Sequence, residues 1–283
     1  MPIAYPEILS LTSEPQPFRW GDRETMLYAL GIGMGSDPMN ETELPFVYES
    51  GLKAVPTMAT VVAWGAGPAV GKMGINYLLV VHGEQKVEFH KTFPTEAEIT
   101  AEGRIIGAYD KGPKGAVIYT ETVLKDARSG EKIATLTGST FARGDGGFGG
   151  PSEGAPEPHE VPTRAPDQTL EFPTRPDQAL IYRLSGDRNP LHSDPKIAAF
   201  AGFPRPILHG LCTYGITCRA VLQAYCDFDP ARIASHQVRF SSPVFPGETI
   251  VVDLWKDGDQ VSFEARVKER GVTVVRNGLS VLR

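Results

Sequence analysis

The feature that most constrains the fold is an order of sequence patterns that repeats on both sides of one segment. Residues 144–168 are crowded with Gly, Pro and acidic residues and have neither a helical nor a strand period, which is typical of a linker. On each side of it, helical patterns precede several short segments rich in β-branched and aromatic residues. The sequence therefore predicts an N-terminal half at 1–143, the linker, and a C-terminal half at 169–283.

The predicted strands of each half are separated by Gly, Pro and Asp, which favours hairpin connections and an antiparallel meander. They span 76–82, 85–90, 100–108 and 115–124 in the first half, and 236–240, 249–256, 260–268 and 272–282 in the second. The predicted helices span 23–30, 57–66, 195–201 and 209–225. A helix followed by hairpin-linked strands buries its apolar face by lying across the sheet, so we expect an α+β architecture.

A short similarity between the halves points to a duplication. Residues 28–31 (Tyr-Ala-Leu-Gly) precede a Ser-Asp-Pro at 36–38, and residues 182–185 (Tyr-Arg-Leu-Ser) precede a Ser-Asp-Pro at 193–195. The two spacings differ by three residues, so chance similarity is the alternative. If the halves are duplicates, the first has apolar residues and glycine after Gly31 where the second has a polar run, and only the second keeps a catalytic set.

Composition argues against several classes of function. The chain has 283 residues, 41% of them hydrophobic and 22% charged, as in a globular protein. Its formal net charge of -6 argues against a general nucleic-acid or membrane-surface binder, since these carry a concentrated basic face. The sequence has no stretch of about 18 apolar residues, the length that a membrane span needs, and its first ten residues lack the features of a signal peptide. We expect a cytoplasmic location.

The cysteines and histidines do not suggest a metal centre. Cys212, Cys218 and Cys226 fall in one apolar stretch, where they are expected to be small buried hydrophobic residues rather than a disulfide set. None of the six histidines forms the closely spaced pair typical of zinc ligands. We therefore expect no bound metal.

The densest polar signal is the run from Tyr182 to His192, whose Ser, Gly, Asp, Asn and Pro favour a turn. Asp187 and His192 are five residues apart, which would place them on different sides of an ideal helix. A turn can bring both toward one cavity, so the spacing favours a site on a loop. The alternative is a structural turn in which Asp187 bonds nearby backbone amides and His192 is half exposed.

The stretch that follows supports the site on a loop. Pro206 breaks regular structure just before an apolar run at helical spacing, which places His209 and Gly210 at the start of a buried helix. A helix start offers unpaired N–H groups and a positive dipole end, and both suit a carbonyl oxygen that gains negative charge. His209 is interpreted either as a residue that orders this helix start or as a second base.

Here the sequence resembles the hydratase 2 family, the (R)-specific enoyl-CoA hydratases with a MaoC-like hot-dog fold. The segments that carry the resemblance in the second half are 182–192, 206–213, 239–240 and 243–247, and those in the first half are 81–85, 110–112 and 146–150. The Gly-Asp-x-Asn-Pro-x-His run is the specific part, whereas the glycine-rich run alone would be weak. The resemblance covers nearly the whole chain and implies an α+β double hot dog, each repeat a sheet wrapped around a long central helix, with one active site between the halves. It also implies a homodimer.

The resemblance implies a role for each matching residue. Asp187 and His192 activate water, Asn189 helps to orient it, and the Gly210 amide forms the oxyanion hole. The residues expected to contact acyl-CoA are His82, Gly83, Lys111, Gly147, Phe148, Gly149 and Phe240. For some of these a structural interpretation stays open: His82 as the end of a strand, Lys111 as a solvated side chain, and residues 146–150 as a flexible linker.

The chemistry requires these residue types without any metal or redox cofactor. The β-carbon of an enoyl thioester is electrophilic by conjugation, so an enzyme must activate water, stabilise an enolate-like oxygen and deliver a proton to the α-carbon. The sequence thus predicts reversible syn hydration of trans-2-enoyl-CoA to (R)-3-hydroxyacyl-CoA. Two alternatives are a non-catalytic acyl-CoA-binding protein and an acyl-CoA thioesterase.

Overall fold

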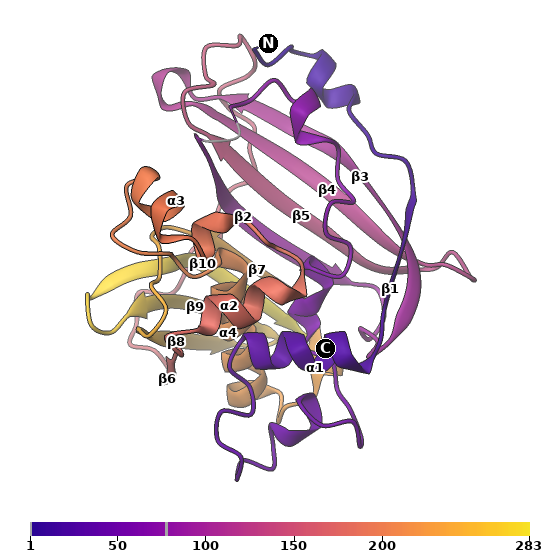
Figure 1. Cartoon of the computed structure of the whole chain (residues 1–283), viewed down its shortest axis with the longest axis vertical. Coiled ribbons are helices and arrows are strands. Elements are labelled where there is room, and N and C mark those ends of the chain that lie inside the picture. The colour runs from indigo at the N-terminus through magenta and orange to yellow at the C-terminus, as the bar shows by residue number, and fades with distance from the viewer. Residues whose placement is uncertain (1, 77–78) are drawn as a thin grey trace.

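The structure, a computed structural model, describes residues 2–76 and 79–283. Within these residues ten strands form one antiparallel sheet (Figure 1). The strands of the N-terminal half are β1 (Gln16–Trp20), β2 (Val80–Phe89), β3 (Ala97–Asp110), β4 (Ala116–Asp126) and β5 (Lys132–Ala142). Those of the C-terminal half are β6 (Gln168–Pro173), β7 (Ile233–Phe240), β8 (Thr249–Asp257), β9 (Gln260–Val267) and β10 (Val272–Leu282).

The strand order repeats symmetrically about the centre of the sheet. It runs β1-β3-β4-β5-β2-β7-β10-β9-β8-β6, so each half is a three-stranded meander flanked by its first strand on the outside and its second strand at the centre. The halves meet where β2 pairs with β7, with Val87 opposite His236. This mirrored order confirms that the two halves share one architecture.

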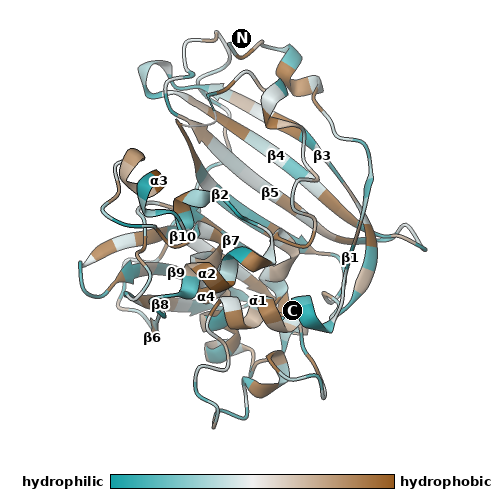
Figure 2. Cartoon of the chain, viewed as in Figure 1, coloured by the Kyte–Doolittle hydropathy of each residue, from teal (hydrophilic) through white to brown (hydrophobic). Residues whose placement is uncertain are grey.

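The helices lie mainly at the junction of the halves. They are α1 (Asp22–Gly31), α2 (Gln178–Tyr182), α3 (Pro195–Phe200) and α4 (Gly210–Tyr225). The α4 helix is buried over most of its length and contacts β6 to β10, so it is the central helix of the C-terminal half. Apolar and polar residues alternate along the strands, as a half-buried sheet requires (Figure 2).

The α1 helix of the N-terminal half packs closely against the C-terminal half. A Cβ on Gly215 of α4 would lie 2.6 Å from Ile32 Cγ2 and 2.9 Å from Tyr28 Oη, so only glycine allows this approach. Near the end of α1, Gln178 Nε2 donates hydrogen bonds to the carbonyls of Gly31 (2.6 Å) and Leu30 (3.3 Å). The two halves therefore share one hydrophobic core.

The expected long helix at 57–66 is not present. A short 3₁₀ helix, Pro56–Thr60, takes its place and is followed by turns. The segment is rich in β-branched residues, and Gly65 has a positive φ of 87°, so helix propensity is low and a stop signal comes early. The long central helix is thus a feature of the C-terminal half alone.

Most predicted strands are confirmed, with differences at three places. The strands expected at 76–82 and 85–90 are one strand, β2, which begins at Val80; Tyr77 and Leu78 lie outside the described residues. β5, whose many Thr and Ser residues obscure its alternation, and the short edge strands β1 and β6 are not among the predicted strands. Three of the four predicted helices are confirmed.

The segment between β5 and β6 has neither helix nor strand, but it is attached to the sheet. Tyr109 Oη donates to the Gly154 carbonyl at 2.8 Å, and Asn277 Nδ2 donates to the His159 carbonyl at 2.7 Å. His159 Nε2 lies 2.8 Å from Ser262 Oγ. Since the neighbouring Phe263 packs on the α4 side of the sheet through His236, Ser262 faces the opposite side, and the segment crosses that outer face.

Candidate active site

The loop that carries Asp187 follows α2 and is shaped by side chains that bond the backbone. Gly186 has a φ of 151°, which favours glycine. The Asn189 amide N–H donates to Asp187 Oδ1 at 3.0 Å, and Asn189 Oδ1 accepts from the Leu191 amide at 3.0 Å, which caps the 3₁₀ helix Pro190–His192. These two turns hold Asp187 and His192 on the same side of the loop.

Asp187 and His192 form a close pair with one free nitrogen. Asp187 Oδ2 lies 3.9 Å from His192 Nε2, too far for a direct hydrogen bond but short enough for one water molecule to contact both atoms. His192 Nδ1 lies 2.9 Å from the Ile207 carbonyl, and because a carbonyl only accepts, Nδ1 carries the proton. In the neutral ring Nε2 is then an unprotonated acceptor that faces the carboxylate.

Burial keeps this histidine neutral. The His192 side chain is only 10% exposed, and loss of hydration lowers the pKa of the ring below its ordinary value. The hydrogen bond to Ile207 and the charge of Asp187 act in the opposite direction. At neutral pH His192 is therefore a neutral imidazole that can accept a proton.

His209 joins this pair to the start of α4. Its ring stacks on His192 with centroids 3.7 Å apart and planes tilted by 26°. His209 Nε2 donates to the Asp187 carbonyl at 3.1 Å, and the His209 carbonyl accepts from the Cys212 amide at 3.0 Å in the first turn of α4. The structure supports the interpretation of His209 as a residue that orders the helix start.

Gly210 is the first residue of α4, and its N–H bonds no acceptor among the described residues. Such an amide at the positive end of a helix can bind an anionic oxygen. The ring of Phe240 covers this position, since a Cβ on Gly210 would lie 3.3 Å from Phe240 Cε1. Phe240 also contacts His82, with ring centroids 5.0 Å apart.

A bulge in β2 turns His82 toward this site. The pairing of β2 with β5 shifts register between His82 and Glu84, which leaves Gly83 as the extra residue. A side chain at Gly83 would meet Ser139 Oγ at 2.6 Å, so the bulge needs glycine. His82 is exposed, and the charge of Asp187 acts on its ring, which places the two residues in the same neighbourhood.

The remaining predicted residues form a second group around Asp110. Its carboxylate accepts hydrogen bonds from the amides of Gly112 (2.8 Å), Gly147 (2.8 Å) and Gly149 (2.9 Å), and these bonds lower its pKa. Phe148 packs against Tyr5, and Lys111 Nζ donates to the Ser152 carbonyl at 2.5 Å. The glycine-rich run is therefore a fixed loop, and no described contact joins it to Asp187.

Sequence reasoning missed three parts of the site. The Ile207 carbonyl, which sets the tautomer of His192, carries no side-chain signal at all. Asp110 was noted only as part of a similar segment, although an acidic residue near several glycines is a known way to fix a loop. His209 and His192 are far apart in sequence, so their stacking was hidden.

Asp187, His192 and His209 also place three potential metal-ligand atoms within 4.8 Å of one another. A metal lies in the plane of each imidazole that binds it, at about 2.0–2.1 Å for zinc. The His192 and His209 rings are stacked 3.7 Å apart with planes tilted by 26°. Their two planes therefore intersect much farther from the rings than a metal–nitrogen bond can reach. One ion therefore cannot bind both rings in this arrangement, so the cluster does not fit a metal centre.

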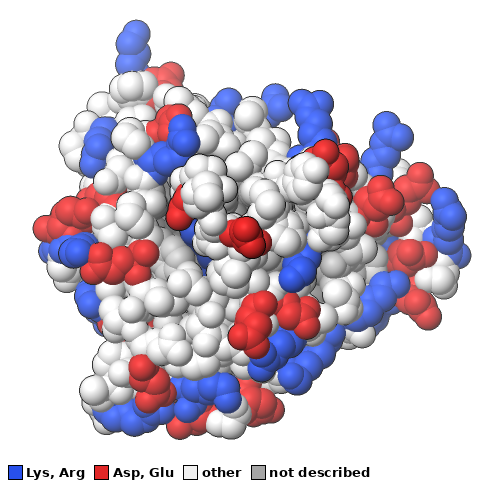
Figure 3. Space-filling view, turned by 90° about the horizontal axis from the view of Figure 1, so that it is seen from below, with Lys and Arg blue, Asp and Glu red and all other residues white. Residues whose placement is uncertain are grey.

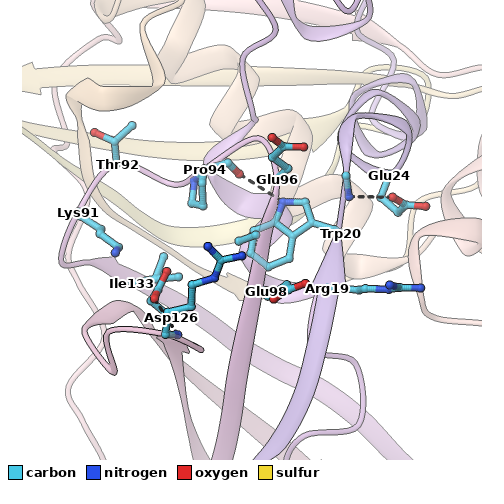
Figure 4. Close-up of a pocket in the computed structure, with 13 residues that line it drawn as sticks. Arg19, Trp20, Glu24, Lys91, Thr92, Pro94, Glu96, Glu98, Asp126 and Ile133 are labelled. Atoms are coloured by element: carbon cyan, nitrogen blue, oxygen red, sulfur yellow. Dashed lines mark hydrogen bonds between the residues drawn. The ribbon is translucent and has the colours of Figure 1, made fainter.

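A groove lies elsewhere, beside β1. It has a volume of about 940 Å³ and contains charged residues of both signs around Trp20, whose Nε1 donates to the Pro94 carbonyl at 3.3 Å (Figure 4). None of the predicted site residues lines it.

No described helix is long and apolar enough to span a membrane.

The three cysteines are free and buried, as predicted. Burial raises the pKa of each thiol, to about 12 for Cys218 and about 11 for Cys226. A protonated thiol is a poor nucleophile and a poor metal ligand. The cysteines are therefore packing residues.

Comparison with known proteins follows the division into halves. Residues 158–277 match the MaoC-like domain, and residues 18–144 match the N-terminal domain of the MFE-2 hydratase 2. The chain is 42% identical to the enoyl-CoA hydratase ChsH3 of Mycobacterium tuberculosis, covering 100% of this chain and 99% of that one. It is 38% identical to the peroxisomal enoyl-CoA hydratase 2 of Arabidopsis thaliana, over 91% and 89%. A MaoC-like dehydratase from Phytophthora capsici superposes with a TM-score of 0.87 at 37% identity, over 98% of this chain and 97% of that one.

Proposed function

The chain belongs to the hydratase 2 family of MaoC-like enoyl-CoA hydratases, and from this premise we propose how its residues hydrate a trans-2-enoyl-CoA to the (R)-3-hydroxyacyl-CoA. The fold is the α+β double hot dog, and the enzyme is a hydro-lyase. One observation carries the proposed mechanism: Asp187 Oδ2 and the free Nε2 of His192 lie 3.9 Å apart, and His209 links them to the helix start at Gly210.

Water binds between the carboxylate and the imidazole, each of which accepts one of its hydrogens. The thioester oxygen accepts a hydrogen bond from the Gly210 amide, which polarises the conjugated double bond. As the water oxygen bonds to the β-carbon, the pair takes one proton from water and delivers one to the α-carbon on the same face. The pair ends in its starting protonation state, so the cycle needs no cofactor.

Asn189 acts on this site through the backbone. Its side-chain oxygen caps Pro190–His192 and its amide N–H holds the Asp187 carboxylate. In the proposed mechanism Asn189 therefore orients the water by fixing both residues that hold it. Its side-chain amide nitrogen has no hydrogen-bond acceptor among the described residues and can donate to the substrate.

The acyl-CoA lies across the junction of β2 and β7 in this proposal. His82, Gly83 and Phe240 contact the thioester end beside Gly210. Lys111 and the loop that contains Gly147, Phe148 and Gly149 contact the CoA moiety, where a lysine and a rigid glycine-rich backbone suit phosphates.

Two expectations complete the proposal. A cytoplasmic location agrees with three free cysteines, since disulfides are rare in reducing compartments. The family suggests a homodimer, which sedimentation would test.

Charges of both signs are interspersed on the face shown in Figure 3, which agrees with a small-molecule substrate rather than a nucleic acid.

The test is the loss of the ultraviolet absorbance of the enoyl thioester when purified protein is mixed with crotonyl-CoA or a medium-chain trans-2-enoyl-CoA. Chiral analysis of the product is expected to give the (R)-3-hydroxyacyl-CoA. Release of free CoA would favour a thioesterase instead. Binding without turnover of either compound would favour an acyl-CoA-binding protein.

A further inference from the structure

His209 is buried, lies outside the proposed proton-transfer pair, and contacts all three parts of the site. Its ring stacks on the His192 ring at 3.7 Å. Its Nε2–H holds the Asp187 carbonyl at 3.1 Å. Its own carbonyl accepts the Cys212 amide in the first turn of α4, beside the Gly210 amide. His209 therefore connects Asp187, His192 and the start of α4.

We propose that His209 is a positioning residue that fixes the distance between the Asp187–His192 pair and the Gly210 amide. The inference rests on the proposed roles of those three residues. A positioning residue must itself be held in place. The His209 ring contacts two others: the Tyr182 ring, with centroids 5.0 Å apart, and the His192 ring. Stack and hydrogen bond together leave the ring little freedom to rotate.

His209 performs this role as a neutral ring. Burial, together with the nearby His192 and Arg183, lowers its pKa to about 3, against the effect of the Asp187 carbonyl. Since Nε2 carries the proton, the buried Nδ1 is an unprotonated acceptor, and it has no partner among the described residues. A charged ring here would repel a proton from His192, so neutrality preserves the basicity of the pair.

The two contacts can be removed separately. In His209→Gln the side-chain amide keeps a donor for the Asp187 carbonyl but removes the stacked ring. In His209→Phe the ring stays but the donor is lost. Because small displacements in a site cost up to about 10²-fold, we expect each variant to lower kcat roughly 10-fold and His209→Ala roughly 100-fold, with KM for crotonyl-CoA little changed.

The pH profile distinguishes positioning from a general effect on folding. Without the stacked ring, water reaches His192 and its pKa rises toward the ordinary value of about 6.5. The acidic limb of kcat/KM is therefore expected to move to higher pH in His209→Gln and His209→Ala, and to stay in place in His209→Phe. Exposed His90, which bonds Thr135 Oγ1, supplies the control His90→Gln, expected to match the wild type.

The experiment measures kcat, KM and the pH profile of these variants below their own melting temperatures, with Asp187→Asn and His192→Ala alongside. Wild-type kcat and an unmoved profile in both His209→Gln and His209→Phe would overturn the inference. So would a failure of His209→Gln to fold at any temperature, since that would make the residue structural. Near-normal turnover in Asp187→Asn and His192→Ala would instead overturn the proposed mechanism itself.

Discussion

The two halves share one plan but differ at each position that the mechanism uses. Tyr28 and Tyr182 are separated by 154 residues, as are Pro56 and Gly210, and the two tyrosine rings pack 5.9 Å apart at the junction. Asp37 and Asp194 each accept a hydrogen bond from the amide two residues later. These matched positions support the predicted duplication.

The difference begins after the matched tyrosines. In the C-terminal half a polar loop leads to α4, whose first residue, Gly210, keeps its N–H. In the N-terminal half Ile32 and Met34 are buried in the core, and the corresponding 3₁₀ helix begins with Pro56, which has no N–H. In the proposed mechanism the N-terminal half therefore supplies neither the acid–base pair nor the oxyanion donor.

The largest expected effect follows from removing one member of the proposed acid–base pair of the C-terminal half. His192→Gln removes the imidazole Nε2 that faces Asp187, and general acid–base assistance contributes roughly 10²- to 10⁴-fold. We expect a loss of kcat of that order with an unchanged melting temperature. A kcat within threefold of wild type would show that the pair is not where the chemistry occurs.

Gly210→Pro gives the C-terminal half the residue that the N-terminal half has. Proline is well tolerated at the first position of a helix, and His209 already has an extended backbone, with ψ of 135°. The substitution removes the proposed oxyanion donor, so we expect kcat to fall about 10²- to 10³-fold. Gly210→Ala keeps the N–H but brings a Cβ against Phe240. If both variants lose activity equally, crowding by Phe240 rather than the N–H is responsible.

The N-terminal half is predicted to matter for stability through one buried ion pair. Glu43, 1% exposed, accepts from Arg219 Nε of α4 at 2.6 Å and from the Gly35 amide at 3.0 Å. Removing one partner of a buried pair leaves the other charge uncompensated, so Glu43→Gln is expected to lower the free energy of unfolding by about 3 kcal/mol. The exposed Glu41→Gln serves as the control in denaturant unfolding, and equal stability of the two variants would contradict the prediction.

The smallest effect concerns the pairing of the halves at β2 and β7. His236 is fully buried opposite Val87, bonded to Ser280 and Thr217, and burial lowers its pKa to about 3. Below about pH 6.5 the unfolded chain binds a proton that the folded one does not, so this stabilisation is lost as pH falls from 6.5 toward 3. Between pH 7 and 5.5 this amounts to about 1 kcal/mol. His236→Gln is expected to remove that part of the pH dependence of unfolding, and an unchanged dependence would count against a neutral buried ring.

The sequence allowed the two-half architecture, most strands and the turn at 186–192 to be predicted, because periodicity and turn chemistry are local signals. The helix predicted at 57–66 is absent. The apolar residues of this segment have helical spacing, but its β-branched residues and its early glycine oppose a helix. Contacts between distant segments were not predictable: the bulge at Gly83, the stacking of His192 on His209 and the carboxylate of Asp110 within the glycine loop arise only from tertiary packing.

The central claim is that only the C-terminal half is catalytic, and one aspartate from each half tests it most directly. Asp187→Asn and Asp37→Asn are made separately, and kcat/KM for hydration of crotonyl-CoA is measured for both. We expect roughly a 10³-fold loss for Asp187→Asn and a value within about twofold of wild type for Asp37→Asn. Near-normal activity of Asp187→Asn, or equal losses in both variants, would contradict this account.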